Sequence, residues 1–217
     1  MTKAAHELDE IVNSVPVQKY LKALQDAKPL SDSTIPEIHK PALYAVMRLL
    51  GDAKTASILY VASSYGLGMK MISEAGYRNI RGIDVDKMAV DFCVSQGLHA
   101  NVMDAAQTSF PDNSFDIVVS RDFVAPTYWP QERLTTFLNE QHRILKPGGF
   151  AVFTTMWPMI PPYHSENLPK ITEIEASQFK GSRPIAMSIR LIMPKDTVSV
   201  SAGLQADYLT VTYQKSP

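Results

Sequence analysis

The sequence predicts an α/β fold, a doubly wound and mostly parallel sheet with helices on both faces and an antiparallel hairpin at its C-terminal end. From residue 58 onward, short apolar runs alternate with stretches of helical periodicity, which is typical of parallel strands joined by crossover helices. Near the C-terminus, strand-like runs at 187–192 and 208–213 flank a turn-rich polar segment, which favours an antiparallel hairpin.

The first 54 residues are expected to be helical. Apolar side chains recur at helical spacing over 8–15 and again over 17–24, after Pro16. Pro41 suits the first turn of a further helix, because an N–H at that position would have no partner within the helix. Gly51 is expected to end this helix, since glycine readily adopts the left-handed conformation of a C-cap.

The central part of the chain is expected to contain the parallel strands and their crossover helices. The strands are placed at 57–61, 79–83, 100–103, 115–119 and 150–155. The helices are placed at 68–74, 87–96 and 131–144, with another in 171–179 that ends at Gly181.

Composition and charge narrow the class of protein. A chain of 217 residues fits one domain with a single core, so 1–217 is treated as one unit. The formal net charge of −1, without a run of Lys and Arg, argues against nucleic-acid binding, which needs a concentrated basic surface. No apolar stretch approaches the roughly 20 residues of a membrane-spanning helix, and the N-terminus is polar and acidic. A cytoplasmic location without membrane contact is therefore expected.

The reactive residue types form no recognisable metal or nucleophile motif. The single Cys93 excludes an internal disulfide and a cysteine-rich metal site. No His, Asp, Glu and Cys set has the spacing of metal ligands, so no metal is expected. Ser63-Ser64 lacks the glycines that flank a nucleophilic serine. His6 and His39 show no partner in the sequence.

A ligand site is predicted beyond the carboxyl ends of the strands, where open parallel sheets bind their ligands. Ala62, Ser64 and Gly66 are small, so a ligand can approach the backbone of the loop after the first strand. Asp84 ends the second strand, roughly 20 residues further on, where a carboxylate accepts hydrogen bonds from ribose hydroxyls. The alternative is that Asp84 or Asp86 only caps the helix that follows.

A nicotinamide dinucleotide is a weaker candidate for the ligand. Gly66-Leu67-Gly68 begins like a dinucleotide-binding loop, but Met71 stands where glycine or alanine belongs. This partial match gives a dehydrogenase little support.

Two stretches resemble class I S-adenosylmethionine (SAM) dependent methyltransferases very closely. They are residues 110–120, FPDNSFDIVVS, and 142–150, HRILKPGGF. The resemblance covers about 55–156 and implies a Rossmann-like methyltransferase fold, with SAM as methyl donor and S-adenosylhomocysteine (SAH) as product. The loop after the first strand departs from the family pattern, because Tyr60 replaces the usual acid and two glycines before Gly66 are missing.

The resemblance also implies which residues bind the donor. Asp84 would hold the ribose, Asp104 the adenine amino group, and Ala105 would pack on the adenine ring. For Asp104, an ordinary turn position without a ligand is the alternative. Tyr60 can donate a hydrogen bond but has no negative charge at neutral pH, and Tyr65 adds bulk. The alternative is that these two tyrosines fill a redundant cleft. The complete predicted donor-binding set is Tyr60, Ala62, Ser64, Gly66, Asp84, Val85, Met88, Asp104, Ala105 and Arg121.

Methyl transfer depends mainly on aligning nucleophile, methyl carbon and leaving sulfur in a dry pocket, so no fixed catalytic motif is expected. Asp122 follows the fourth strand and is a candidate to orient or deprotonate the substrate; pairing with Arg121 or capping a helix is the alternative. His164 titrates near neutrality and is a candidate base, with an exposed loop position as the alternative. His142 lies in a stretch that is structural in the family.

Four aromatic residues are predicted to line the substrate pocket. Trp157 and Tyr163 lie on the stiff, proline-rich segment after the fifth strand, and such apolar side chains suit a small organic ligand. Tyr20 and Tyr44 lie on the N-terminal helices, which in small-molecule methyltransferases often form a lid. For each of these two tyrosines, an ordinary partly buried position is the alternative.

We therefore predict SAM-dependent methyl transfer to an O, N or C nucleophile of a small organic molecule. Residues 1–54 would form the lid, 55–156 the SAM-binding core, and 157–217 the substrate loop, a helix and the edge hairpin. The alternative is a protein of this fold that transfers no methyl, either an enzyme of altered chemistry such as a cyclase or a non-catalytic partner subunit. A homodimer or a related partner subunit is left open.

Overall fold

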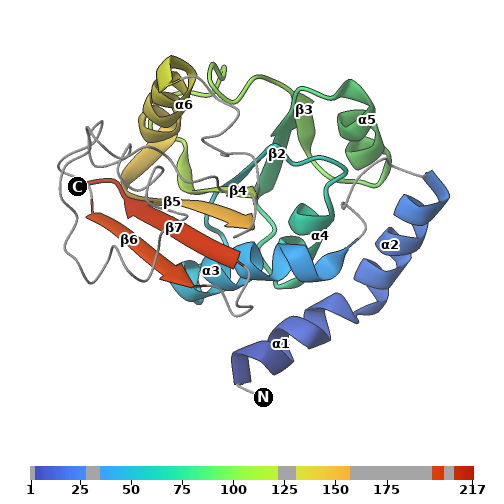
Figure 1. Ribbon diagram of the computed structural model, residues 1–217. Helices are drawn as coiled ribbons and strands as arrows, with labels where there is room; N and C mark the ends of the chain where they lie inside the picture. The colour runs from blue at the N-terminus through green and yellow to red at the C-terminus, as the bar shows by residue number, and fades with distance from the viewer. Residues whose placement is uncertain (1–2, 28–34, 122–130, 157–196, 203–207) are drawn as a thin grey trace.

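A seven-stranded sheet forms the centre of the molecule (Figure 1). The computed structural model describes residues 3–27, 35–121, 131–156, 197–202 and 208–217. The strands lie in the order β3-β2-β1-β4-β5-β7-β6. Their bounds are β1 Ile58–Val61, β2 Ile80–Asp84, β3 Ala100–Val102, β4 Phe115–Arg121, β5 Leu145–Met156, β6 Thr197–Ala202 and β7 Tyr208–Gln214. Neighbours from β3 to β5 are parallel, and β7 is antiparallel to both β5 and β6, which confirms the predicted fold class.

The strand order reverses at the centre of the sheet. β2 and β3 lie on one side of β1, whereas β4 and β5 lie on the other. Val61 of β1 pairs with Ser120 of β4, so the two strands end at nearly the same level. In open α/β sheets ligands bind beyond the carboxyl ends of the strands at such a reversal.

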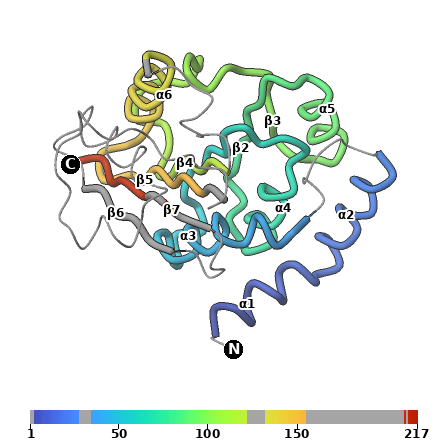
Figure 2. Tube along the Cα trace, in the orientation of Figure 1, coloured from blue at the N-terminus to red at the C-terminus, as the bar shows by residue number. Residues whose placement is uncertain are grey.

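Helices cover both faces of the sheet. Their bounds are α1 Lys3–Val12, α2 Val15–Ala27, the 3₁₀ turn η2 Pro36–His39, α3 Lys40–Leu50, α4 Leu67–Glu74, α5 Lys87–Ser95 and α6 Gln131–Ile144. Alternate residues of β1 face opposite layers: Ile58 and Tyr60 join the core with α3 and α4, whereas Leu59 and Val61 join the core with α6. Figure 2 shows α1 and α2 outside α3 and α4, and the C-terminus at the far edge of the sheet.

Two helix ends follow the sequence predictions. Pro41 lies in the first turn of α3, and Gly51 ends this helix with a φ of 49°. The burial pattern agrees with the predicted periodicity, since one side of each N-terminal helix faces the core. Within the residues described, no helix has both the length and the apolar character needed to cross a bilayer.

The C-terminal hairpin differs from the prediction in one strand. The partner of β7 is Thr197–Ala202, which lies in the segment predicted to be a turn. Its β-branched residues alternate with serines, and the polar residues hid this period-2 pattern. The run 187–192 predicted for that strand, and the helix predicted in 171–179, lie outside the described residues.

Strand β5 begins earlier than its apolar run suggested. Leu145 already pairs with Phe115, and a register shift follows between Phe115 and Ile117. The Lys-Pro-Gly-Gly segment is therefore accommodated within the strand, as bulges allow, rather than before it.

Candidate functional site

The loop between β1 and α4, residues 62–66, has the backbone of a glycine-rich turn. Ala62, Ser64 and Gly66 all adopt left-handed dihedral angles, with φ values of 50°, 47° and 76°. This conformation costs an L-residue roughly 1–2 kcal/mol, and glycine is the usual residue there. Only Gly66 is a glycine. The β1–α4 loop therefore has the backbone path of a glycine-rich turn, with Ala62 and Ser64 in a strained conformation.

Neighbouring elements hold this backbone in place. The N–H of Ser64 donates to Asp84 Oδ2, at the end of β2, over 2.7 Å. From α2, the hydroxyl of Tyr20 donates to the carbonyl of Tyr65 over 2.7 Å. From α5, the thiol of Cys93 donates to the carbonyl of Ser64 over 3.3 Å. Strained residues persist where their surroundings fix them in this way.

Gly66 is a position that can carry no side chain. A Cβ there would lie 2.7 Å from Cys93 Sγ and 2.8 Å from both Tyr20 Oη and Leu98 Cδ1. The close approach of α2 and α5 to the β1–α4 loop therefore requires glycine, in addition to the left-handed φ.

Asp84 binds the β1–α4 loop rather than capping a helix. Besides accepting from Ser64, its carboxylate accepts from the N–H of Asp86 through Oδ1, over 2.9 Å. Asp86 is the N-cap of α5, since its side chain accepts from the N–H groups of Met88 and Ala89. The two aspartates thus have separate structural roles, and each oxygen of Asp84 has a further lone pair for a ligand.

Two apolar side chains lie exposed just beyond Asp84. Val85 is 66% exposed and Met88 is 73% exposed. Single exposed apolar residues are common. Here, however, both follow the carboxylate that ends β2, so they offer an apolar surface beside a hydrogen-bond acceptor.

Asp104 and Ala105 form the turn after β3. One oxygen of Asp104 accepts from the N–H of Ala106 over 2.9 Å, and the other lies 3.6 Å from Arg133 Nη2. Ala105 is buried, and its carbonyl accepts from Gln141 Nε2 over 2.7 Å. Both Arg133 and Gln141 belong to α6, so this helix fixes the turn beside the site.

Tyr60, near the carboxyl end of β1, is buried against the first turn of α4. It is 2% exposed, and a Cβ on Gly68 would lie 2.5 Å from its hydroxyl oxygen. The phenol ring thus needs a glycine at position 68. His39, the last residue of η2, approaches the same hydroxyl, with Nδ1 at 3.4 Å from Tyr60 Oη. A phenol and an imidazole therefore meet where the family has a carboxylate.

The imidazole of His39 is neutral at neutral pH. Burial lowers its pKa well below the ordinary value, and the positive charge of Arg121, at the end of β4, lowers it further. The side chain is 5% exposed, yet Nε2 has no hydrogen-bond partner in the part of the chain that the structure describes. Buried polar atoms are nearly always paired, so an unpaired ring nitrogen is a group that a ligand can satisfy.

Unlike Tyr60, Tyr65 does not pack at the end of β1. Its ring packs on Phe92 of α5, edge to face, with centroids 5.6 Å apart, and Tyr20 contacts the same ring at 5.8 Å. The three aromatic residues join α2, α5 and the β1–α4 loop. Burial also raises the pKa of the Tyr20 hydroxyl, which therefore stays a hydrogen-bond donor at neutral pH.

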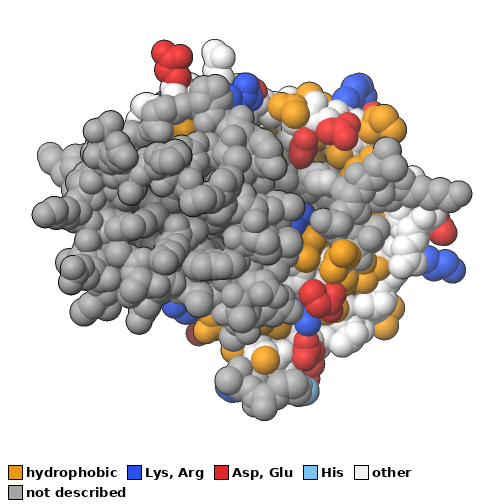
Figure 3. All heavy atoms as spheres, viewed as in Figure 1, with side chains coloured by type: hydrophobic (Ala, Val, Ile, Leu, Met, Phe, Trp, Pro, Cys, Tyr) orange, Lys and Arg blue, Asp and Glu red, His pale blue; other side chains and the backbone are white. Residues whose placement is uncertain are grey.

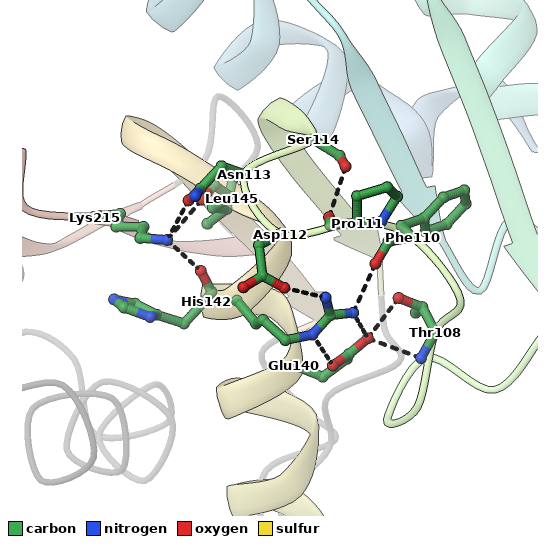
Figure 4. Close-up of polar contacts among 11 residues, drawn as sticks. Thr108, Phe110, Pro111, Asp112, Asn113, Ser114, Glu140, His142, Leu145 and Lys215 are labelled. Atoms are coloured by element: carbon green, nitrogen blue, oxygen red, sulfur yellow. Dashed lines mark hydrogen bonds and ion pairs between the residues drawn. The ribbon is translucent and has the colours of Figure 1, made fainter.

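Ion pairs around Arg143 hold together the region that follows β3 (Figure 4). Arg143 of α6 lies 2.6 Å from Asp112 Oδ1 and 2.7 Å from Glu140 Oε1, and it donates to the carbonyl of Phe110 over 2.9 Å. Glu140 also accepts from the N–H of Thr108 over 2.8 Å. These contacts fix the 108–114 segment on α6 and are structural.

Lys215, just past β7, ties the C-terminal strand to the same region. Its Nζ donates to Asn113 Oδ1 and to the carbonyls of His142 and Leu145 (Figure 4). His142 takes part in this arrangement through its backbone, which agrees with the structural role predicted for its stretch.

Sequence comparison finds similarity to methyltransferases in the central part of the chain. A model of the methyltransferase domain matches residues 59–153. Over this stretch the chain is similar to known methyltransferases. A fatty-acid O-methyltransferase of Mycolicibacterium smegmatis is 28% identical over 136 residues, which cover 60% of this chain and 48% of that protein. A sterol 24-C-methyltransferase of Neurospora crassa is 30% identical over 128 residues, covering 55% of this chain and 32% of that protein.

Solved structures of SAM-dependent methyltransferases share the fold. One from Mesorhizobium loti has a TM-score of 0.58 at 17% identity, over 82% of this chain and 98% of that one. A geranyl diphosphate C-methyltransferase of Streptomyces coelicolor has a TM-score of 0.58 at 14% identity, over 80% and 77%. At these identities the likeness concerns the fold alone. The chain spans about half the length, or less, of the curated relatives it matches.

The structure brings the predicted donor-binding residues together at the carboxyl ends of the parallel strands. They lie at the ends of β1 and β4, on the β1–α4 loop, at the β2–α5 junction and after β3. The predicted pocket tyrosines, in contrast, lie apart. Tyr20 holds the β1–α4 loop, whereas Tyr44 lines a separate cavity of about 290 Å³ that also includes Arg48 and Tyr77. Asp122, Trp157, Tyr163 and His164 lie outside the described residues.

Two site residues were not predicted. His39 meets Tyr60 across 21 residues of sequence, and no local pattern marks such a contact. The helical periodicity of 87–96 predicts that Cys93 faces the sheet, as it does, but not its hydrogen bond to the β1–α4 loop. A search for polar residues on the buried face of a helix would have found Cys93 but not His39.

Figure 3 shows no concentration of positive charge on the described part of the face in view. On the part of the face that Figure 3 colours by residue type, Lys and Arg side chains lie singly among acidic and hydrophobic ones. Among the described residues, no three His, Cys, Asp or Glu side chains gather as metal ligands.

Proposed function

We propose that this chain is a methyltransferase that uses SAM as donor and acts on a small organic molecule. The hydrogen bond from Ser64 N–H to Asp84 Oδ2 carries the proposal. It joins the β1–α4 loop to the acid that ends the next strand, and these are the two parts that hold a nucleoside in folds of this kind. When bound, SAM supplies an electrophilic methyl group on its sulfonium.

The residues present suit the nucleoside half of SAM. Asp84 has lone pairs available for the ribose hydroxyls. Val85 and Met88 are exposed and would cover the adenine ring, while Asp104 would accept from its amino group. The turn that carries Asp104 is anchored to α6 through the carbonyl of Ala105.

The amino-acid half of SAM would meet an altered environment. Tyr60 and His39 are neutral, and the positive charge of Arg121 is close enough to act on His39. A hydrogen bond to a charged group contributes about 1.5–3 kcal/mol, against about 0.5–1.5 kcal/mol between neutral groups. We therefore expect the donor ammonium to bind more weakly here than beside a carboxylate.

The acceptor is proposed to be a small molecule with apolar character. The matched relatives are named for a fatty acid, a sterol, and phthiotriol or phenolphthiotriol dimycocerosates. Methyl transfer requires alignment and exclusion of water more than a dedicated catalytic group. Asp122 and His164 remain the predicted candidates to orient or deprotonate the acceptor.

Calorimetric titration with SAM and SAH tests the proposal. Micromolar binding of both is expected, and Asp84→Asn should weaken both by at least about ten-fold, because the ribose loses a charged acceptor. Asp91→Asn is the matched control, since Asp91 is an exposed acid of α5 that pairs with Lys87. Wild-type protein that binds neither ligand, or an Asp84→Asn variant with unchanged affinity, would contradict the proposal.

The second candidate keeps the fold without methyl transfer. The burial of Tyr60 against Gly68, in place of an acid, is the observation that favours it. On this alternative the chain is an enzyme of different chemistry, such as a cyclase, or a partner subunit. Absence of SAM and SAH binding in a folded, monodisperse preparation would favour it over the methyltransferase.

A further inference from the structure

The part of the candidate site around Tyr60 lacks the negative charge that the family resemblance implies. We define the inner site as His39, Tyr60, Arg121 and Thr154. Tyr60, Arg121 and Thr154 lie near the carboxyl ends of β1, β4 and β5, which are adjacent in the sheet. Arg121 and Thr154 are direct register partners.

All four residues belong to the same face of the sheet. Tyr60, Val119 and Val152 belong to the core that contains α3 and α4. Arg121 and Thr154 each lie two residues further along their strands and therefore face the same way. His39 directly precedes α3 and contacts Tyr60, so it adds a fourth polar group to this face.

Two polar atoms of the inner site are buried and have no hydrogen-bond partner among the described residues. They are His39 Nε2 and Thr154 Oγ1. The Nδ1 of His39 already faces Tyr60 Oη, which leaves Nε2 as the ring atom available to a ligand. If the Tyr60 hydroxyl donates to Nδ1, the proton of the neutral ring is on Nε2, which is then a donor without an acceptor.

The charge that acts on this site is positive. Among the described residues, Arg121 is the charged group that lowers the pKa of His39, and no carboxylate of that part of the chain raises it. The family acid at the position of Tyr60 would have balanced a cation, and this chain lacks it. A cation beside unpaired donors is complementary to an anion with several lone pairs.

We propose that the inner site binds a carboxylate, with Arg121 supplying the charge and His39 Nε2 and Thr154 Oγ1 supplying hydrogen bonds. The inference rests on the proposed function for the identity of the ligands. Two ligands can bring such a group: SAM carries a carboxylate on its amino-acid half, and an acceptor acid carries one of its own. In both cases the carboxylate is held by charge-assisted hydrogen bonds away from bulk water.

Matched ligands separate the two sources. SAM and decarboxylated SAM differ in the donor carboxylate and share the ammonium and nucleoside. Octanoate, octanol and octylamine share an apolar tail and differ in the head group. Calorimetric titrations use the intact chain, wild type and two variants, His39→Leu and Arg121→Met. His99→Leu is the control, because His99 is exposed and uses only its backbone carbonyl in the described contacts.

If the bound carboxylate is that of the donor, the wild type should bind SAM at least about ten-fold more tightly than decarboxylated SAM, and both variants should lose this preference. An acceptor source predicts that octanoate binds at least about ten-fold more tightly than octanol or octylamine, again only while His39 and Arg121 are present. His39→Gln, which keeps a side-chain N–H, should retain part of the affinity in either case. Thermal unfolding of each variant establishes that it is folded.

Two results would overturn the inference. One is a wild-type protein that shows neither preference, and the other is a preference that folded His39→Leu and Arg121→Met proteins retain in full. Octanoate binding that depends on both residues, in a protein that binds neither SAM nor SAH, supports the carboxylate site while refuting the proposed methyltransferase function.

Discussion

The hydroxyl of Tyr20 donates to the carbonyl of Tyr65 over 2.7 Å, so helix α2 holds the β1–α4 loop directly. Tyr20 and Tyr65 also contact the same ring, that of Phe92. The N-terminal helices are thus joined to the part of the molecule where the donor is proposed to bind, and changes in α2 should be felt there.

Tyr20→Phe should lower both stability and affinity for SAH. It keeps the ring contacts but leaves the Tyr65 carbonyl without its donor, which costs about 1–3 kcal/mol when the group is buried. Chemical denaturation measures the loss of stability, and calorimetry the loss of SAH affinity. Tyr44→Phe, in the separate cavity, is the matched control and should change neither. Equal effects of the two substitutions would show that α2 does not support the loop.

Ala62→Gly should stabilise the protein, although glycine usually destabilises. Ala62 has a φ of 50°, and relief of this strain outweighs the entropy that glycine adds to the unfolded chain. We expect the free energy of unfolding to rise by about 0.5–1 kcal/mol. Ala89→Gly, the same change inside α5, should lower it by about 1 kcal/mol or more. A loss of stability in Ala62→Gly would refute the assigned backbone.

Gly68→Ala should destabilise the protein because of Tyr60. The added Cβ would lie 2.5 Å from Tyr60 Oη, and forcing atoms into a packed core costs about 1–3 kcal/mol. In a Tyr60→Val background the same change should become stabilising by about 0.5–1 kcal/mol, because Ala is the better helix former. Denaturant unfolding of the wild type, the two single variants and the double variant gives the coupling free energy between positions 60 and 68. Additive effects would mean that the ring lies elsewhere.

Stability should fall as pH is lowered from 7 toward 5. Burial, together with the charge of Arg121, holds the pKa of His39 well below its ordinary value near 6.5. Below about pH 6.5 the unfolded chain takes up a proton that the folded protein does not, so unfolding is favoured by up to about 1.4 kcal/mol per pH unit. The midpoint of urea unfolding at several pH values measures this. His39→Gln should flatten the dependence and His99→Gln should not.

Much of the fold could be predicted from the sequence because its signals are local. The apolar periodicity of the strands and crossover helices, Pro41 and Gly51 at the ends of α3, and Asp84 at the tip of β2 all depend on neighbouring residues. Strand β6 was missed because its serines look like turn residues. The pairing that makes it a strand comes from β7.

The inner site could not be predicted, because it arises from contacts between distant segments. Whether Tyr60 points into a ligand site or packs on α4 depends on Gly68 and on the approach of His39. Tyr65 looked equally able to fill the cleft, but its ring packs on Phe92 instead. Two aromatic residues five positions apart thus have different consequences, which only tertiary packing decides.

The left-handed angles at Ala62 and Ser64 bear on how such a chain can evolve. Each lost glycine weakens the protein by an amount that a single favourable substitution elsewhere can restore. Glycines can therefore disappear from such a turn one at a time while its path through space survives. The backbone dihedral angles of the turn then still show its glycine-rich origin, although the amino-acid sequence no longer does.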